Sequence, residues 1–331
     1  MASPNPRKEA LVTPGPPRFT STTSPDQTVD RSMSSIVIPD MQPQSSFSKT
    51  TPSESDFCVP DNTEEFWADN LRQARKKIAH IQATVDANVK ISTHNLLVSG
   101  LEQKEIQQLL QKKHSGSRAT FTDEQVLFQI IPGNAHEQLI VFLQQNFVRA
   151  MEAASCPMTR STWVGIGATS SKGRFCGKEP DWGVRPIAGG TSGATNLPPA
   201  EEPWPSLVVE VGSSQGHASL QRDARWWWNN SDGATKLILL FKIKDTRGFA
   251  VEVELWEEVV AHDTGVATRS RPPSISTNLQ RTQSTTVDAS GQHSSISLRY
   301  STLMRQPPGP THPEFVVLTP GMLTDICAPT V

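Results

Sequence analysis

The sequence has few cysteines and no arrangement of them that is typical of a metal site. Its 331 residues include four cysteines, Cys58, Cys156, Cys176 and Cys327. No two of them form a CxxC pair, which argues against a structural zinc site. Four cysteines in a chain of this length also do not make the framework of a small secreted disulfide protein. We therefore expect reduced thiols in an intracellular protein, either nuclear or cytoplasmic.

Long apolar runs and several catalytic motifs are also missing. The first residues, MASPNPRKEALVTPGPPRF, contain no secretory signal, and no stretch reaches the roughly 20 apolar residues that a membrane span needs. We expect no membrane partner. There is no P-loop, no GxGxxG and no GxSxG. The formal net charge of -2 gives no overall electrostatic argument for nucleic acid, so such a partner has to be argued from a site.

Composition divides the chain into five segments. Only 36% of the residues are hydrophobic and 26 are prolines, which indicates an ordered part diluted by disordered segments. We predict a disordered Ser/Thr/Pro-rich tail over 1–60, an amphipathic helical segment over 61–115 and a folded core over 120–260. A disordered insertion over 261–296 then precedes a C-terminal strand and helix over 297–331 that complete the domain.

The helical segment is predicted from a repeating apolar stripe. Its members follow each other at spacings of three and four: Trp67, Leu71, Ala74, Ile78, Ile81 and Val85. A second helix is expected over about 93–113, weakened in its middle by Gly100. Two interpretations stay open: a helical hairpin that docks on its own domain, or a coiled-coil-like arm for self-association through 63–113.

From residue 120 onward, strand-like and helix-like segments alternate. The expected strands are 124–131, 161–168, 173–177, 181–186, 206–212, 235–243 and 249–258, and the expected helices are about 135–153 and 219–230. The strand SLVVEVG over 206–212 is apolar except for one acid, as in a buried central strand. An alternation of this kind predicts an α/β fold.

Two acids stand out because of their positions in these strands. Asp181 begins a short strand after Pro180, and Glu210 lies inside the apolar strand. An unpaired charge in a buried strand is costly, and a divalent ion is one way to stabilise it. Two carboxylates on neighbouring strands can hold Mg²⁺ while leaving several of its waters in place. Glu137, early in the helix that follows the first strand, could approach the same ion.

The ordered segments PGNAHEQL, KEPDWGVRP, WPSLVVEVGSSQ, LQRDARWWWNNSDGATKLILLFKI and VEVELWE resemble the PD-(D/E)XK, or restriction-endonuclease-like, nuclease superfamily. They span about 140 residues, and within the superfamily they look like an uncharacterised fungal group. The resemblance implies an αβββαβ core with a mixed central sheet. It also implies Asp181 and Glu210 as catalytic ligands of Mg²⁺ or Mn²⁺, with Glu137 matching the helix acid and the Val211 carbonyl as a further ligand.

One residue departs from the motif. The superfamily has a lysine two residues after the second acid, where this chain has Gly212. That lysine positions the attacking water or offsets charge in the transition state. Arg222 and Arg225, on the following helix, are the candidates to stabilise charge in its place, although an arginine is a poor base.

Two functions of different classes follow. The first is a Mg²⁺-dependent nuclease that hydrolyses DNA or RNA with a metal-activated water. The alternative is a catalytically degenerate protein that keeps the fold and serves as a binding or assembly module. The missing lysine and the near-neutral charge favour the second, and the presence of every acid of the site favours the first.

Overall fold

The computed structural model describes most of the chain from residue 62 onward, and a few residues before it. The described residues are 46–48, 57, 59–60, 62–87, 93–111, 117–131, 133–159, 162–167, 170–173, 176–187, 204–212, 216–245, 250–262 and 275–328. The disorder predicted for the 1–60 tail thus falls almost entirely on residues outside the described ones. Among the described residues, no helix combines the length and the apolar character that a membrane crossing requires.

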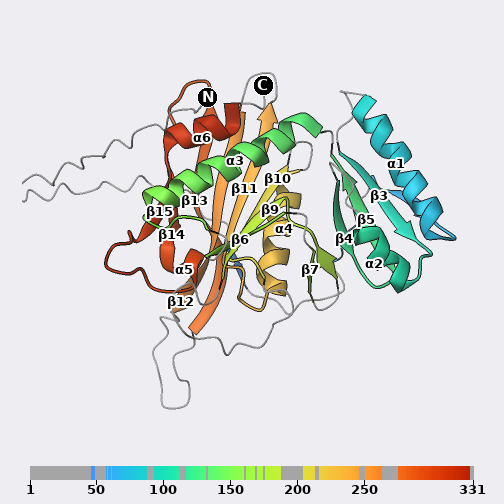
Figure 1. Ribbon diagram of the computed structural model, residues 1–331, viewed down its shortest axis with the longest axis horizontal. Helices are drawn as coiled ribbons and strands as arrows, with labels where there is room; N and C mark the ends of the chain where they lie inside the picture. Colours follow the sequence, from blue (N-terminus) through green and yellow to red (C-terminus); the bar gives the residue numbers. More distant parts are fainter. Residues whose placement is uncertain are drawn as a thin grey trace, which may run out of the picture. The chain divides into compact units, whose positions relative to one another are not determined.

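The core has the predicted αβββαβ order around a mixed sheet (Figure 1). Its elements are α3 (Gly133–Ala153), β6 (Trp163–Ile166), β9 (Trp182–Pro186), β10 (Leu207–Gly212), α4 (His217–Asn230) and β11 (Leu237–Asp245). Strands β10 and β11 are parallel, whereas β6, β9 and β10 pair antiparallel in turn. The α/β fold class and the mixed central sheet are therefore confirmed.

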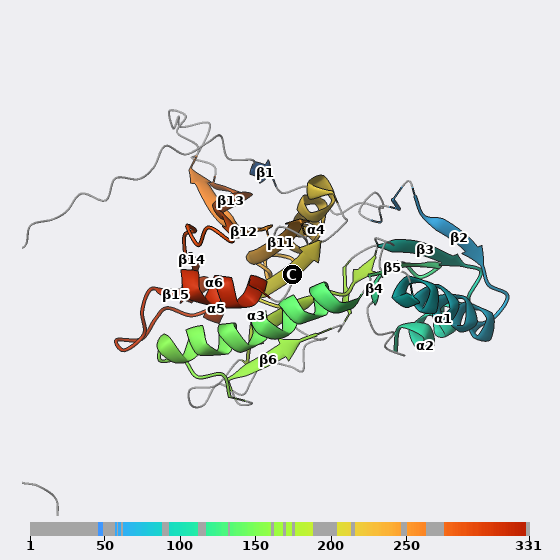
Figure 2. The same ribbon diagram turned by 90° about the horizontal axis from the view of Figure 1, so that it is seen from above.

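The central sheet continues beyond β11. The strands β12 (Ala250–His262), β13 (Ile275–Asp288) and β1 (Ser46–Ser48) extend it, in the order β1-β13-β12-β11-β10-β9-β6. Figure 2 shows α3 and α6 (Pro320–Cys327) on one side of this sheet and α4 on the other. Because helices cover both faces, every residue of β10 is buried, including Glu210.

A second sheet precedes the core in the chain. Its strands are β2 (Glu64–Trp67), β3 (His94–Ser99), β4 (Ser117–Phe121), β5 (Gln125–Ile130), β7 (Ser171–Lys172) and β8 (Gly177–Lys178). They are ordered β2-β3-β5-β4-β8-β7, with α1 (Leu71–Ala87) and α2 (Gln103–Gln111) packed on one face. Because β7 and β8 lie between β6 and β9 in sequence, the core itself completes this second sheet.

The predicted helix over 93–113 is wrong in its first half. Residues 94–99 form β3, which lies between β2 and β5, and only 103–111 are helical. The run Asn95–Val98 is buried between neighbouring strands, so its apolar character is that of a strand. Gly100 ends the strand with φ +89, and a Cβ there would lie 2.7 Å from Cε2 of Trp67.

The apolar stripe of α1 is used inside the domain. Ala74, Ile78, Ile81 and Val85 are buried against β3 and β5, whereas Trp67 is 71% exposed at the end of β2. The first interpretation, a helical hairpin docked on its own domain, holds only for the docking of α1: residues 64–67 form β2, and β3 separates α1 from α2, so the two helices are not a simple hairpin. Self-association through 63–113 stays a prediction, and Trp67 is the stripe residue left on the surface.

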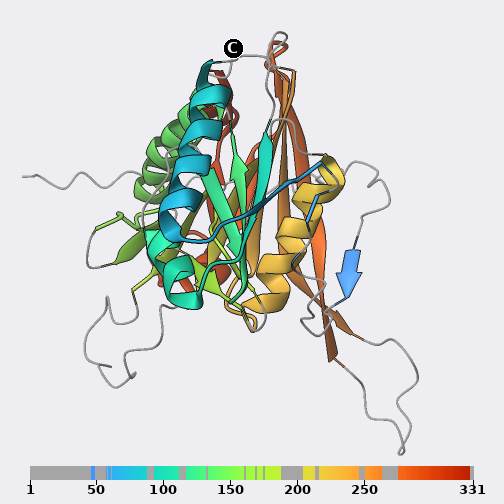
Figure 3. The same ribbon diagram turned by 90° about the vertical axis from the view of Figure 1, so that its right-hand side faces the viewer.

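The predicted disorder over 261–296 is wrong for most of the described part of that segment. Strand β13 pairs with β12 along its whole length, from Ile275 to Asp288 (Figure 3). Its side chains are mainly Ser, Thr, Gln and Asn, and of those whose burial is described, 277–288, Leu279 and Val287 are the buried ones. Backbone pairing with a long partner holds such a strand, so a low apolar content is a poor sign of disorder here.

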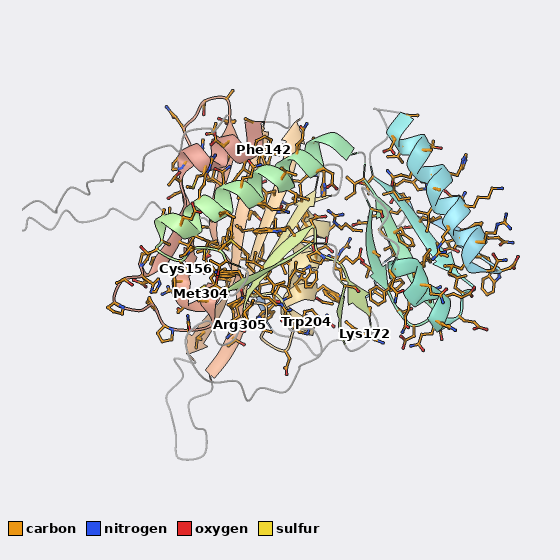
Figure 4. All side chains as sticks on the ribbon, viewed as in Figure 1. Phe142, Cys156, Lys172, Trp204, Met304 and Arg305 are labelled. Atoms are coloured by element: carbon orange, nitrogen blue, oxygen red, sulfur yellow. The ribbon has the colours of Figure 1, made fainter. Side chains whose placement is uncertain are left out.

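The C-terminal segment packs onto the core. It consists of β14 (Ile296–Arg299), α5 (Tyr300–Met304), β15 (Phe315–Leu318) and α6, and its apolar residues join those of α3. Two contacts connect distant parts of the chain (Figure 4): Cys156 Sγ lies 3.9 Å from Met304 Sδ, and Arg305 Nη2 donates to the carbonyl of Trp204 at 2.6 Å.

Candidate active site

The two predicted acids lie side by side on neighbouring strands. Strands β9 and β10 pair antiparallel, with Val209 opposite Trp182, and one further step of this register puts Glu210 opposite Asp181. Residues directly opposite each other in an antiparallel pair place their side chains on the same face of the sheet. Both side chains are almost fully buried, at 3% exposure for Asp181 and 7% for Glu210.

Asp181 is surrounded by hydrogen-bond donors from three elements. Its Oδ1 lies 2.5 Å from Arg118 Nε on β4 and 3.2 Å from His136 Nε2 on α3. Its Oδ2 accepts a hydrogen bond from the backbone N–H of Val211 at 2.6 Å. Burial raises the pKa of Asp181, but the charges of His136 and Arg118 and the Val211 N–H outweigh it and hold this pKa well below its usual range. These contacts therefore favour the ionised form of Asp181.

His136 connects Asp181 with Glu137. Its Nδ1 lies 3.5 Å from Glu137 Oε1, and Arg118 Nη2 lies 3.7 Å from the same oxygen. Burial lowers the pKa of His136, yet the charge of Asp181 and the close contacts with Asp181 and Glu137 raise it to about 9. The imidazole is thus cationic at neutral pH, and it lies between Asp181 and Glu137.

Glu210 has a different environment. Its Oε1 accepts a hydrogen bond from Trp227 Nε1 at 2.5 Å and lies 3.3 Å from Lys178 Nζ. Burial raises the pKa of Glu210 to about 8, because the opposing effect of Lys178 is countered by the negative charges of Asp181 and Asp223. Asp181 and Glu210 thus differ: the surroundings of Asp181 favour its ionised form, whereas Glu210 keeps its proton near neutral pH.

Lys178 is a site residue that the sequence did not single out. It belongs to β8, is 7% exposed, and lies 2.5 Å from Asp223 Oδ1 as well as close to Glu210. Burial lowers the pKa of Lys178, and the two acids reverse this and raise it. The only sequence signal was its position three residues before Asp181, in GKEPD. A strand of two residues has no periodicity from which burial could be inferred.

Arg118 was also not predicted, because it belongs to the second sheet. Along β4, Ser117 and Ala119 are buried, and Arg118 points to the opposite face, where it is 12% exposed. Its pairing with Asp181 depends on β4 lying beside β8, which leads into the core. No local pattern in the β4 sequence SRATF predicts this contact with Asp181.

The other predicted residues are placed less centrally. Glu137 contacts His136 and Arg118, and its side chain is 44% exposed. Among the described residues, the cations within ion-pair distance of Asp181 or Glu210 are Arg118, His136 and Lys178. Arg222 lies on the exposed face of α4 and Arg225 is half-buried on the same helix, and neither belongs to this set.

The predicted three-acid set does not come together. Within the described ranges, no group of three or more His, Cys, Asp or Glu side chains is placed to hold a metal ion, so Glu137 does not join Asp181 and Glu210 around one point. Asp181 and Glu210 are left as a pair of carboxylates, and Mg²⁺ commonly takes only one or two carboxylates and completes its shell with water and substrate phosphates.

Several buried atoms of the site also lack a directed partner. Arg118 Nε, both ring nitrogens of His136, Lys178 Nζ and Asp181 Oδ1 have short ion-pair contacts without hydrogen-bond geometry among the described residues.

Comparisons with known proteins add little. No protein-family model matches the sequence, and no curated protein matches it. One similar solved structure, from Anabaena variabilis, is described as a "putative nuclease belonging to DUF820". It has 14% sequence identity and a TM-score of 0.30, and the match covers 51% of this chain and 89% of that chain. At this TM-score the likeness supports no functional conclusion.

Proposed function

We propose that this protein is a metal-dependent nuclease that hydrolyses phosphodiester bonds of DNA or RNA. The observation that supports it is the pair of buried carboxylates, Asp181 and Glu210, on the same face of neighbouring strands, with the Lys178 ammonium beside the second one. Burying charged groups costs desolvation free energy even when a cation pairs with them. A buried cluster of this kind is therefore a candidate functional site. Their environments also separate their pKa values, as is common in catalytic sites.

In this proposal Asp181 and Glu210 hold the ion. When bound, Mg²⁺ or Mn²⁺ lowers the pKa of a water and neutralises charge on the phosphate. The Val211 N–H orients Asp181, and the Trp227 N–H orients Glu210. In the reaction the water oxygen forms a bond to phosphorus and the ester P–O bond breaks. The water proton passes to solvent, and the leaving oxygen takes a proton from solvent.

The test uses the purified full chain with single-stranded and duplex DNA and RNA, in Mg²⁺, in Mn²⁺ and in EDTA. We expect cleavage that requires the ion and is lost in Asp181→Asn and Glu210→Gln. Glu254→Gln on β12 is a matched control, because Glu254 is also a buried strand acid, bonded to Trp256 Nε1 at 3.0 Å and paired with Arg281 at 2.6 Å. Cleavage that survives in the double variant of Asp181 and Glu210 refutes the assignment.

One observation favours the second candidate, a degenerate site in a binding module. Both oxygens of Asp181 are already engaged, by Arg118 and His136 on one side and by Val211 on the other. If Arg118 and His136 already neutralise the carboxylate, the site would bind no metal ion. Calorimetric titration with Mn²⁺ separates the two candidates: saturable binding that disappears in Glu210→Gln supports the nuclease, and no binding at millimolar Mn²⁺ supports the degenerate module.

A further inference from the structure

A polar cavity lies toward the opposite end of the core sheet from the two acids. Its volume is about 580 Å³, which is in the range of small-molecule sites. Leu237 at the start of β11 pairs with Leu207, so Lys236 is four residues, or about 13 Å along the strands, from the level of Glu210. The cavity is therefore separate from the candidate active site. Its lining comes from the turn between α4 and β11, the start of β11 and the end of α5: residues 232–234, Lys236, Ser301, Thr302 and Arg305.

The guanidinium of Arg305 is fixed at this cavity by two backbone carbonyls. Its Nη2 donates to the carbonyl of Trp204 at 2.6 Å and to that of Ala234 at 3.1 Å (Figure 4). Within the described part of the chain, its Nε and Nη1 have no hydrogen-bond acceptor. These two nitrogens are therefore left to donate to a ligand in the cavity.

The positive charge of Arg305 is not balanced by an acid. Partial burial and the charge of Arg185 on β9 both lower the pKa of Arg305. Neither arginine forms an ion pair with any residue that the structure describes. Neighbouring cations repel each other, and an anion bound beside them offsets that repulsion. The surroundings of Arg305 thus favour an anionic ligand.

Further hydrogen-bond donors line the same cavity. The hydroxyls of Ser301 and Thr302, on α5, make no hydrogen bond among the described residues. Lys236 pairs with Glu258 at 2.6 Å, which compensates its charge but leaves its ammonium with further N–H donors. Phosphate oxygens are strong acceptors that arginine binds well, so these donors match a phosphate group.

Asp232 is the acidic residue of the lining. It is exposed and makes no hydrogen bond or ion pair with the other described residues. Its carboxylate repels a phosphate, but it accepts hydrogen bonds from hydroxyl groups. The cavity is also many times the roughly 30 Å³ that a water molecule takes up, so a phosphate alone would leave most of it unfilled. A phosphate joined to a hydroxyl-bearing group suits both parts of the lining.

We propose that this cavity binds a sugar phosphate, with the phosphate at Arg305, Ser301 and Thr302 and a sugar hydroxyl at Asp232. The proposal concerns a second site and does not depend on the nuclease activity. A free sugar phosphate and a mononucleotide share this chemistry, so the test includes both.

The first test is calorimetric titration of the full chain with ribose 5-phosphate and with adenosine 5′-monophosphate. We expect saturable binding of at least one of them, and ribose and inorganic phosphate should each bind about tenfold more weakly or worse. The tighter ligand shows whether the sugar phosphate is free or part of a nucleotide. No saturable binding of either ligand up to about 10 mM overturns the proposal. Equal affinity for inorganic phosphate overturns it as well.

The second test compares the two arginines that flank α5. Arg305→Gln should weaken binding by about tenfold or more through the loss of charge-assisted hydrogen bonds. Arg299→Gln is the matched control, because it removes the same charge at the other end of α5, where Arg299 pairs with Glu314 at 2.9 Å outside the cavity. Its affinity should stay within twofold of the parent protein. Equal affinities of Arg305→Gln and Arg299→Gln overturn the proposal.

A further variant guards against misfolding of Arg305→Gln, since Arg305 also connects two segments of the chain. The double variant Ser301→Ala/Thr302→Ala keeps both bonds of Arg305 and should still weaken binding by about tenfold. An affinity within twofold of the parent protein in this double variant overturns the proposal. Asp181→Asn should bind the ligand as the parent protein does, and loss of binding there would place the ligand at the acids and overturn the second site.

Discussion

The unusual protonation of Glu210 predicts how the metal-free protein should respond to pH. The pKa of this carboxyl is about 8 in the folded chain against its usual 4.5, chiefly because it is buried. The folded state therefore holds one more proton than the unfolded state between these two values. The stability gained from this proton is complete below pH 4.5 and is lost as the pH rises through about 8.

The size of the effect follows from the pKa difference. Each pKa unit corresponds to about 1.4 kcal/mol, so the loss in free energy of unfolding is at most about 5 kcal/mol. Glu210→Gln removes the titration while keeping an oxygen that can accept the Trp227 N–H. We expect this variant and the parent protein to have similar stability at pH 5 to 6, and the variant to be more stable by about 2–5 kcal/mol at pH 9.

Urea unfolding in EDTA, followed by fluorescence and circular dichroism from pH 5 to 9, measures both curves. His136, whose pKa is raised from 6.5 to about 9, loses its own contribution over that interval in both proteins, so the difference between the curves isolates Glu210. Two curves that fall in parallel over the whole range would refute the argument, because Glu210 would then titrate as an ordinary surface acid.

Four further outcomes are expected. Arg118→Met should destabilise the protein by about 3 kcal/mol, because it leaves the Asp181 carboxylate with less compensation, and should move the acid limb of the stability curve to higher pH, as urea unfolding would show. Trp227→Phe should cost about 1–3 kcal/mol through the lost bond to Glu210, whereas equal melting temperatures would show that this bond contributes nothing. Gly212→Ala should cost about 1–3 kcal/mol in chemical unfolding, because a Cβ there would lie 2.8 Å from Leu220 Cδ1, and less in a Leu220→Ala background. Ile78→Ala should cost about 2–5 kcal/mol with an unchanged sedimentation coefficient, and a shift in that coefficient would show that the stripe serves a partner.

The core could be predicted because its elements carry strong local patterns. The run LVVEVG is apolar on both faces, as a central strand must be, and Glu210 is conspicuous inside it. The Pro-Asp dipeptide marks the start of the preceding strand, so Asp181 could also be identified from the sequence. The pairing of β9 with β10 then brings these two acids side by side.

The cations of the site could not be predicted in the same way. Arg118 and Lys178 come from short strands of the other sheet, and their side chains reach the acids only because β4 pairs with β8. The acids could thus be recognised from the apolar strand residues around them in the sequence. Their cationic partners could not, because they depend on which strands pair.

The distribution of charge around the two acids connects fold and chemistry. Asp181 has two cations and a backbone N–H, and Glu210 has one lysine that it shares with Asp223. Metal binding should therefore act mainly on Glu210, since a carboxylate ligand must be deprotonated and this one keeps its proton up to about pH 8. Each bound Mn²⁺ should release up to one proton at pH 7, which calorimetry in buffers of different ionisation enthalpy can count. A proton count of zero with tight binding would place the ion elsewhere in the protein and would remove the reason for keeping Glu210 buried beside Asp181.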